Sequence, residues 1–403
     1  MANHDPVKDW ETDYNIFDKD YVEDPVPIWK DLRGKCPIAH TERWGGSWLP
    51  TKYEDLQAFV KMVPALSSKE PLVVPPPEVD EDADDIYATE APPITSDPPE
   101  QIPMRRLILP FFTAKAVEEH RQFTVDLCNE LIDGFIEKGE CDGAVDYAQQ
   151  IPPRVIGHML GIDPARSGEF VEWVRGVLEL GLQDQELRLK YRRIIRDFFY
   201  ETVNERRQNM GNDLVSRLIN SELDGEPLDD RTIVGMCNLL LVAGIDTTWS
   251  SIGSAIWHFA STPEHQERLR NEPDLFPSAI EEMLRFYSPV TMARVVTEEV
   301  QAGDVTFKPG DRVLMNFPGA NHDPDVFDNP DEVILDRGRN RHIAFGIGIH
   351  RCAGSNLARL EMDIALRTWF ERIPEFEISD PDKVTWAGGQ VRGPRNIPIK
   401  FPT

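Results

Sequence analysis

Residues 229–262 place the strongest limit on the architecture, because their apolar side chains occupy nearly every helical face. A helix that is apolar all round has to be buried in a protein interior or in a membrane. At ~1.5 Å per residue this stretch would span roughly 45 Å, the full width of the molecule. The longest apolar run within it, residues 236–245, falls short of the ~18 residues of a membrane span. We therefore expect one long helix through the centre of the protein.

Further helical patterns dominate from about residue 114 to residue 370. Residues 114–139 and 186–209 have the periodicity of one-faced helices. Strand-like pieces are fewer and lie at residues 43–50, 294–317 and 391–401, the last two with Gly and Pro at turns. The chain of 403 residues carries no internal repeat. The expected fold is mainly α with small β-sheets, in one domain over residues 1–403.

The charge of the chain excludes some classes of partner. It holds 70 Asp and Glu against 43 Lys and Arg, a net charge of −27, which argues against nucleic acid and anionic membrane surfaces. The first residues have neither the basic nor the apolar region of a signal peptide. The five cysteines are scattered and form no CxxC pair. A reducing cytoplasm is therefore expected, with no membrane attachment.

Residues 70–104 form the most biased segment, with nine prolines and ten carboxylates. Proline at this density is incompatible with a regular helix or a central strand. The composition does not change character on either side of the segment. A long loop within one domain is therefore favoured over a linker between two domains.

One of the cysteines, Cys352, lies in the stretch AFGIGIHRCAGSNLARLEM, residues 344–362. Gly346 and Gly348 permit a tight backbone path and the close approach of a flat ligand. Leu357 and Leu360 belong to a helical face that begins just after Cys352, and a sulfur at a helix N-terminus is favoured as thiolate. A thiolate that faces a cavity is a metal ligand or a nucleophile. The alternative is a buried structural cysteine.

Three motifs occur here in the order found in one enzyme family. Residues 345–354 match the pattern FGxGxHxCxG through Phe345, Gly346, Gly348, His350, Cys352 and Gly354. AGIDTT at residues 243–248 and EEMLR at residues 281–285 occur upstream. The first motif resembles the haem-binding loop of the cytochromes P-450, and the others resemble the oxygen-activating groove and the ExxR pair of that family. The resemblance covers nearly the whole chain and implies the family's single-domain, mainly α triangular prism.

The resemblance implies haem b as the cofactor, with Cys352 as the axial iron ligand. Thiolate ligation favours cleavage of the O–O bond. His350 is the competing candidate, since other haem proteins use histidine, but Cys352 at the helix start is the better-placed donor. The family assigns that histidine to a haem propionate, and Arg105 and Arg294 match positions that pair with the propionates. The remaining cofactor-binding residues of the loop are Phe345, Gly346 and Gly354.

In the central helix, Gly244, Asp246 and Thr247 are poor helix formers, which favours a locally opened turn that can hold oxygen and water. By resemblance, Thr247 steadies the reduced oxygen and Asp246 relays protons to it through water. The alternative is that Thr247 only donates a hydrogen bond to the carbonyl four residues earlier.

Glu282 and Arg285 are three residues apart on a predicted helix and can form an ion pair. By resemblance they join Arg337 in a buried structural triad that is needed for haem incorporation. One motif departs from the family. The usual DPPEHTRLR reads DPPEQIPMR at residues 97–105, so Gln101, which cannot carry charge, replaces the usual propionate histidine. Pro103 either disturbs the following helix or opens it as an early helical proline.

The chain contains no flavin or iron–sulfur segment, so electrons have to come from another protein. Bacterial relatives usually use a ferredoxin and an NAD(P)H-dependent ferredoxin reductase. Basic residues around the loops expected on the cysteine side could form a docking patch for an acidic ferredoxin, although a mixed solvated surface explains them equally well. These residues are Arg106, Lys115, Arg339, Arg341, Arg351 and Arg359.

The expected function is that of a haem-thiolate monooxygenase that activates O2 and hydroxylates, or O- or N-dealkylates, a small and mostly apolar organic substrate. A peroxide-driven peroxygenase on the same fold is one alternative, and the Asp246–Thr247 pair argues against it. A non-catalytic haem sensor or carrier is the other.

The expected substrate pocket is apolar and is lined by Ala243, Gly244, Val290 and Met292. By resemblance the loop of residues 70–104 covers it, with Val73, Val74 and Ile86 as further apolar candidates. Between Lys69 and Arg105 the loop contains no Lys, Arg or His. A free substrate carboxylate held by this loop is therefore not expected, because a buried charge needs a partner. Arg392 is the residue that could bind an anion from another side.

Overall fold

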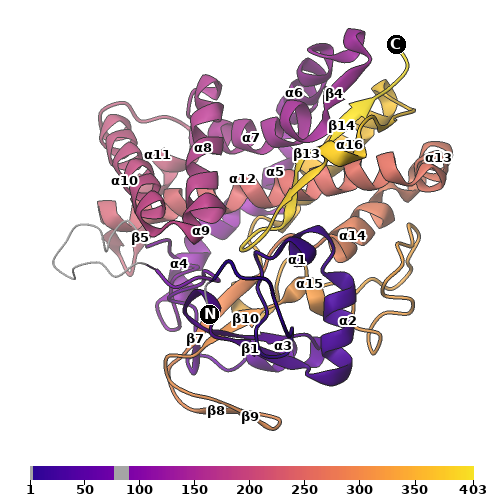
Figure 1. Ribbon diagram of the computed structural model, residues 1–403. Helices are drawn as coiled ribbons and strands as arrows, with labels where there is room; N and C mark the ends of the chain where they lie inside the picture. The colour runs from indigo at the N-terminus through magenta and orange to yellow at the C-terminus, as the bar shows by residue number, and fades with distance from the viewer. Residues whose placement is uncertain (1–2, 77–89) are drawn as a thin grey trace.

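The computed structural model describes residues 3–76 and 90–403 (Figure 1). The helix expected at residues 229–262 is α12 (Asp230–Ser261), which crosses the molecule without interruption. Asp229 caps its first turn by accepting a hydrogen bond from the backbone N–H of Thr232. Packed against it are α7 (Ile151–Leu160), α8 (Ser167–Leu178), α10 (Gln185–Gln208) and α16 (Ser355–Arg372). The prediction of a central buried helix is confirmed.

By length and composition, α12 is the one helix in the described part of the chain that could cross a membrane. In this fold 61% of its most apolar window is buried. Burial by neighbouring helices is the ordinary environment of an apolar core helix.

The remaining helices surround this core. They include α2 (Val26–Lys35), α3 (Tyr53–Phe59), α4 (Gln101–Ile108), α5 (Ala114–Glu118), α6 (Arg121–Asp133), α11 (Leu214–Ile219), α13 (Pro263–Asn271) and α14 (Phe276–Phe286). The single helix expected over residues 114–139 is wrong. A turn at Glu119 and His120 separates α5 from α6, and a short 3-10 turn follows α6.

A five-stranded sheet lies beside the helical core (Figure 1). Its order is β1 (Ile38–Thr41), β2 (Ser47–Pro50), β10 (Arg312–Met315), β7 (Met292–Val296) and β3 (Leu66–Ser67). All neighbours are antiparallel except β2 and β10, which pair in parallel with Trp48 opposite Val313. Met292 and Arg294 are two residues apart on β7, so they share one face of the strand. That face is turned toward the site described below.

Smaller sheets complete the fold. Near the C-terminus, β13 (Gly393–Asn396) pairs with β12 (Thr385–Ala387), while β14 (Pro398–Lys400) lies between β11 (Glu377–Ile378) and β4 (Glu140–Asp142). A hairpin of β8 (Val300–Ala302) and β9 (Val305–Phe307) joins β7 to β10. The prediction of a mainly α single domain with small β-sheets is confirmed.

The proline- and acid-rich segment ends earlier than residue 104. Residues 70–76 and 90–100 are turns and irregular backbone, but α4 begins at Gln101. Pro103 lies in the first turn of α4, where a missing N–H leaves no helical hydrogen bond unmade. Ile86 and most of the acidic run of the segment lie outside the described residues.

Candidate active site

The loop that carries Cys352 is held in shape by its own backbone. The N–H of Cys352 donates to the carbonyl of Phe345 at 2.8 Å, and the N–H of Gly346 donates to Ile343 at 2.8 Å. Gly346 has φ of 65° and Gly348 has φ of 75°, conformations that side-chain-bearing residues rarely adopt. α16 begins three residues after the cysteine, at Ser355. The thiol is thereby turned into a cavity.

This inner cavity, of about 1420 Å³ with its solvent-connected space, separates the cysteine loop from α12. Cys352, Phe345 and Gly354 line one side, and Ala243, Gly244 and Thr247 line the opposite side. Most of the surface between them is apolar, with Ile108, Phe112, Leu284 and Phe317 among its residues. Removal from water raises the pKa of the Cys352 thiol, while the Gly354 backbone and nearby arginines lower it.

Three nitrogen-bearing side chains gather at one edge of this cavity. Arg294 is 5% exposed, and its guanidinium donates to the carbonyl of Ala293 at 2.7 Å. Arg105 donates to the carbonyl of Arg351. The Nε2 atom of His350 is buried without a hydrogen-bond partner. Desolvation together with Arg294 and Arg105 lowers the pKa of His350 to about 4, and desolvation lowers that of Arg294 to about 10. Within the described residues none of the three forms an ion pair, so the edge is suited to an anionic ligand.

The expected opened turn in the central helix is absent. Thr247 lines the cavity, but its hydroxyl donates to the carbonyl of Ala243 at 2.8 Å, and α12 stays regular. Gly244 has a different reason to be glycine, because a Cβ at this position would lie 2.6 Å from Cδ1 of Ile156. The glycine allows α12 and α7 to pack closely where they cross.

Asp246 lies away from the cavity and is fully buried. Its Oδ1 atom accepts from Arg395 at 3.0 Å and from the Ser250 hydroxyl at 3.1 Å, while its Oδ2 atom has no partner. Burial raises the pKa of Asp246, and the positive charge of Arg395 opposes this shift. Arg395 also pairs with Glu179 at 2.8 Å, and Glu179 pairs with Arg175 of α8 at 2.7 Å. A chain of ion pairs, buried at Asp246 and Arg395, therefore connects α12 to the end of α8.

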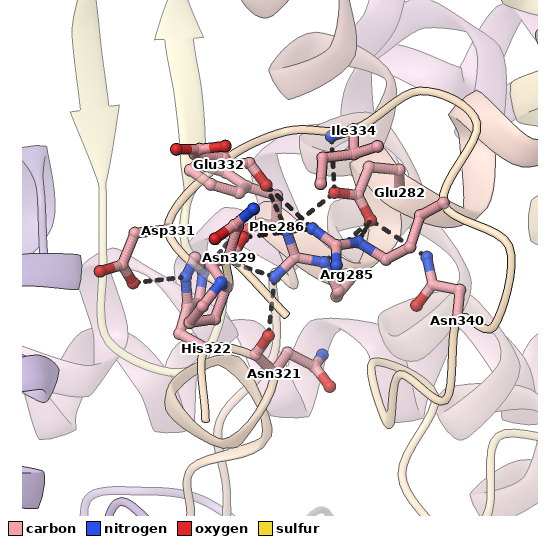
Figure 2. A network of polar contacts seen from close by, with 12 residues as sticks. Glu282, Arg285, Phe286, Asn321, His322, Asn329, Asp331, Glu332, Ile334 and Asn340 are labelled. Carbon is pink, nitrogen blue, oxygen red and sulfur yellow. Dashed lines mark hydrogen bonds and ion pairs between the residues drawn. The ribbon is translucent and has the colours of Figure 1, made fainter. Parts of the chain in front are cut away.

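The predicted ion-pair triad is brought together between α14 and the segment of residues 321–340 (Figure 2). Arg285 binds Glu282 through two hydrogen bonds of 2.8 Å, and Arg337 binds the same carboxylate at 3.0 Å. Asn340 and the backbone N–H of Ile334 also donate to Glu282. The remaining N–H groups of Arg285 donate to the carbonyls of residues 321, 330 and 332. This arrangement satisfies all three charges and fixes the irregular segment of residues 321–340 against α14.

Comparisons with known proteins agree with this geometry. The family model for cytochrome P-450 matches residues 177–386. 6-Deoxyerythronolide B hydroxylase of Saccharopolyspora erythraea is 32% identical over 386 residues, which cover 92% of this chain and 94% of the relative. Nocardicin C N-oxygenase of Nocardia uniformis is 32% identical over 405 residues, which cover 94% and 97%. The chain belongs to the cytochrome P-450 family.

The fold leads to the same family. The solved structure of the bacillaene polyketide synthase cytochrome P-450 of Bacillus subtilis has a TM-score of 0.86 at 28% identity, over 96% of this chain and 99% of that chain. This protein is therefore a cytochrome P-450 monooxygenase whose cofactor is haem b. The residues present fit that cofactor, because a thiol and an edge of unpaired nitrogen donors face the same apolar cavity.

The departure at Gln101 has a structural explanation in this P-450. Gln101 is 1% exposed and does not line the inner cavity. Its Nε2 atom donates to the carbonyl of Ile349 at 2.9 Å. The side chain therefore ties α4 to the cysteine loop, and the positive charge at this edge comes from Arg105 and Arg294.

The predicted pocket residues divide into two groups. Ala243, Gly244, Val290 and Met292 line the inner cavity. Val73 and Val74 are wrong as lining residues, because they pack into the hydrophobic core beside the sheet. Arg392 is also wrong as an anion-binding residue. Its guanidinium donates to the carbonyls of Val22 and Glu23, both at 2.7 Å, and lies 4.4 Å from the ring of Trp386.

The sequence did not point to Arg395, Glu179 or Arg192. The first two form the ion-pair chain of Asp246, and Arg192 of α10 lines a second, outer cavity. A signal for Arg192 is present in the sequence. Arg188 and Arg192 are four residues apart and fall on the same helical face as the buried Ile195 and Phe199. Charged residues that repeat on the buried face of a helix indicate either ion pairs or a bound ligand.

Proposed function

We propose that this P-450 hydroxylates, or O- or N-dealkylates, an organic substrate with a mostly apolar body, using electrons from a ferredoxin and its NAD(P)H-dependent reductase in the cytoplasm. The observation that carries the proposal is the position of the Cys352 thiol, which faces Thr247 of α12 across an apolar cavity. Relatives named as a hydroxylase and an N-oxygenase support oxygen insertion as the reaction.

Cys352 would hold the haem iron, and His350, Arg105 and Arg294 would hold the propionates. Thiolate-ligated haem supplies O2 activation and O–O bond cleavage when bound. Coordination to a metal keeps a thiol deprotonated, which overcomes the raised pKa of Cys352. The unpartnered Nε2 atom of His350 is available as a donor or acceptor to a propionate. Phe345, Gly346 and Gly354 line the same cavity and would contact the haem.

Thr247 would hold and deliver a proton at its hydroxyl on the cavity side of α12. Its present acceptor, the carbonyl of Ala243, leaves the oxygen lone pairs free to accept from water. Asp246 would supply protons to that water. It has to rotate to do so, and the partnerless Oδ2 atom and raised pKa of its carboxyl favour proton exchange. Arg395 holds the carboxylate in its buried position between these events.

The ferredoxin would dock on the side of the cysteine loop. Arg106, Arg339, Arg341 and Arg351 are exposed, as is Lys115, although the chain as a whole is acidic. Arg359 is partly withdrawn, since it pairs with Glu281 and lies 4.5 Å from the ring of Phe345. A local positive surface accelerates the encounter with an acidic protein and makes it dependent on salt.

The proposal is tested by the spectrum of the reduced, CO-bound enzyme and by turnover with a ferredoxin system. We expect the thiolate-type Soret band in the wild type and its loss in Cys352→His, because imidazole would replace the sulfur donor. Product should form only when NAD(P)H, O2 and ferredoxin are all present. A thiolate-type band that persists in the variant would exclude Cys352, and product formed from peroxide alone would replace the monooxygenase by a peroxygenase.

A further inference from the structure

The outer cavity adjoins the inner one. It has a volume of about 960 Å³ with its solvent-connected space and shares Ala243, Thr247 and Met292 with the inner cavity. Along α12 it extends from Asn238 to Thr247, which at ~1.5 Å per residue is roughly 13 Å. The two cavities are therefore adjacent chambers along α12. A substrate that lies beside Thr247 also has room in the outer chamber.

The outer chamber contains a cation that has no partner among the residues that the structure describes. Arg192 lines it from α10 and is partly buried. Within residues 3–76 and 90–403 no carboxylate, carbonyl or hydroxyl accepts a hydrogen bond from its guanidinium. Arg312, which also lines this chamber, differs in this respect because it pairs with Glu70 at 2.7 Å and donates to the carbonyl of Leu72 at 2.7 Å.

Neighbouring residues raise the free-energy cost of burying the charge of Arg192. Arg188 lies one helical turn before Arg192, is fully buried and donates to the carbonyls of Val74 and Pro75. Two cations four residues apart on one helix face repel each other. Desolvation and the charge of Arg188 lower the pKa of Arg192 to about 9, so the side chain stays positive at neutral pH. An unpaired buried charge is costly unless an anion binds it.

We propose that the substrate of this P-450 carries a terminal carboxylate, which Arg192 binds in the outer chamber while the apolar body extends toward Thr247. This inference rests on the proposed function and specifies its substrate class. A guanidinium binds a carboxylate through two parallel hydrogen bonds. The cation comes from α10 and not from the segment of residues 70–104, which agrees with the absence of Lys, Arg and His from that segment.

The two chambers also indicate the length of the substrate. The outer chamber extends roughly 13 Å along α12, from Asn238 to Thr247, so an extended substrate can hold its anionic group well away from the carbon beside Thr247. Apolar residues, among them Leu239, Val242 and Val290, line the path between the two ends. The expected substrate is therefore a long or multi-ring amphiphile that is oxidised far from its carboxylate.

The test uses the haem-loaded enzyme and probes that an imidazole anchors at the iron. The probes are ω-(imidazolyl)decanoic acid, its primary amide and ω-(imidazolyl)butanoic acid, and the dissociation constants come from the shift of the Soret band and from calorimetry. The wild type should bind the decanoic acid about 10- to 100-fold more tightly than the amide. Arg192→Gln should remove this preference and leave the amide constant within about 2-fold. Arg192→Lys should retain part of it.

Two controls separate charge from structure. Arg193→Gln changes the net charge equally on an exposed position of the same helix and should leave all constants unchanged. The butanoic acid is too short to reach Arg192 and should show no dependence on this residue. Equal affinity of acid and amide in the wild type, or a preference that persists in Arg192→Gln, would overturn the proposed carboxylate site while the haem-thiolate assignment stands. A holoenzyme in which none of the probes shifts the Soret band would overturn the assignment of the inner cavity, and the inference with it.

Discussion

Thr247 combines two interactions that the sequence presented as alternatives. Its hydroxyl donates to the carbonyl of Ala243, as a helical threonine commonly does, and the same side chain faces the cavity opposite Cys352. A hydroxyl bound in this way can still accept a proton from water and pass its own proton onward. A single residue therefore belongs to the helix and to the site at the same time.

We predict that Thr247→Ala retains haem and substrate binding but uncouples NAD(P)H consumption from product formation. Without the hydroxyl, protons reach the reduced oxygen without control, so hydrogen peroxide forms in place of product. Product per NAD(P)H should fall roughly 10-fold or more, while Thr247→Ser stays near the wild type. The measurement is the ratio of product, peroxide and NAD(P)H consumed, and an unchanged ratio in the alanine variant would show that the hydroxyl is only structural.

Between elements, the Glu282 carboxylate connects α14 with the segment that leads to the cysteine loop. It accepts hydrogen bonds from Arg285, Arg337, Asn340 and the N–H of Ile334. Figure 2 shows how these donors converge from chain positions that are far apart in sequence. These hydrogen bonds, which we call the Glu282 clamp, hold in place the irregular segment of residues 321–340, which has no helix or sheet to fix it.

We predict that Glu282→Gln lowers the free energy of unfolding by about 3–5 kcal/mol, because it leaves Arg285 and Arg337 buried without a countercharge. Haem content after purification should fall with it, since the cysteine loop depends on this segment. The matched control is Glu281→Gln. Glu281 is about a third exposed and pairs with Arg359 and His342, so its loss should cost about 1 kcal/mol or less. Equal urea midpoints and equal haem content for Glu282→Gln and the wild type would show that Glu282 does not stabilise this segment.

The helices were predictable where the information is local. The apolar pattern of α12 and the one-faced pattern of α10 needed no tertiary knowledge. The break between α5 and α6 at His120 was missed because no Gly or Pro marks it. Low helix propensity at Gly244 indicated an opened turn, but the residue is explained by contact with Ile156 of another helix. Local preference cannot distinguish these two causes.

The site residues also divide into those that a local motif predicts and those that depend on contacts between distant elements. Cys352, Glu282 and Arg285 were identified because each belongs to a short motif with fixed spacing. Asp246 was also identified, but its partner was not, because Arg395 is 149 residues away along the chain. Arg192 acquires its meaning only when α10 packs beside α12 and closes a chamber. The sequence therefore predicted the enzyme family, whereas contacts between distant elements became visible only in the fold.

For the molecule as a whole, His258 links stability to pH. It is buried at the end of α12, where Nδ1 lies 2.8 Å from the Tyr287 hydroxyl after α14, and Nε2 lies 2.9 Å from Nδ1 of His265 on α13. Desolvation, with a smaller contribution from His265, lowers the pKa of His258 to about 3. The folded protein therefore keeps this ring neutral across the physiological range.

Below pH ~6.5 an unfolded His258 takes up a proton that the folded protein rejects, so stability is complete above that pH and decreases as pH falls toward 3. At pH 5 this group alone should reduce the free energy of unfolding by about 1–2 kcal/mol. We predict that urea unfolding of the wild type loses this much more stability between pH 7 and pH 5 than His258→Gln does. Parallel pH profiles for the two proteins would show that His258 titrates normally.

The parallel pairing of β2 with β10 has a consequence for folding during translation. Trp48 and Val313 are partners in the sheet although about 265 residues separate them. A ribosome that adds ~5–20 residues per second delivers the second strand roughly 10–50 s after the first. Until then the β1–β2 hairpin emerges with one edge unpaired, which is open to pairing with another nascent chain. The N-terminal part of this P-450 therefore depends, during translation, on protection that its own sequence supplies only near the end.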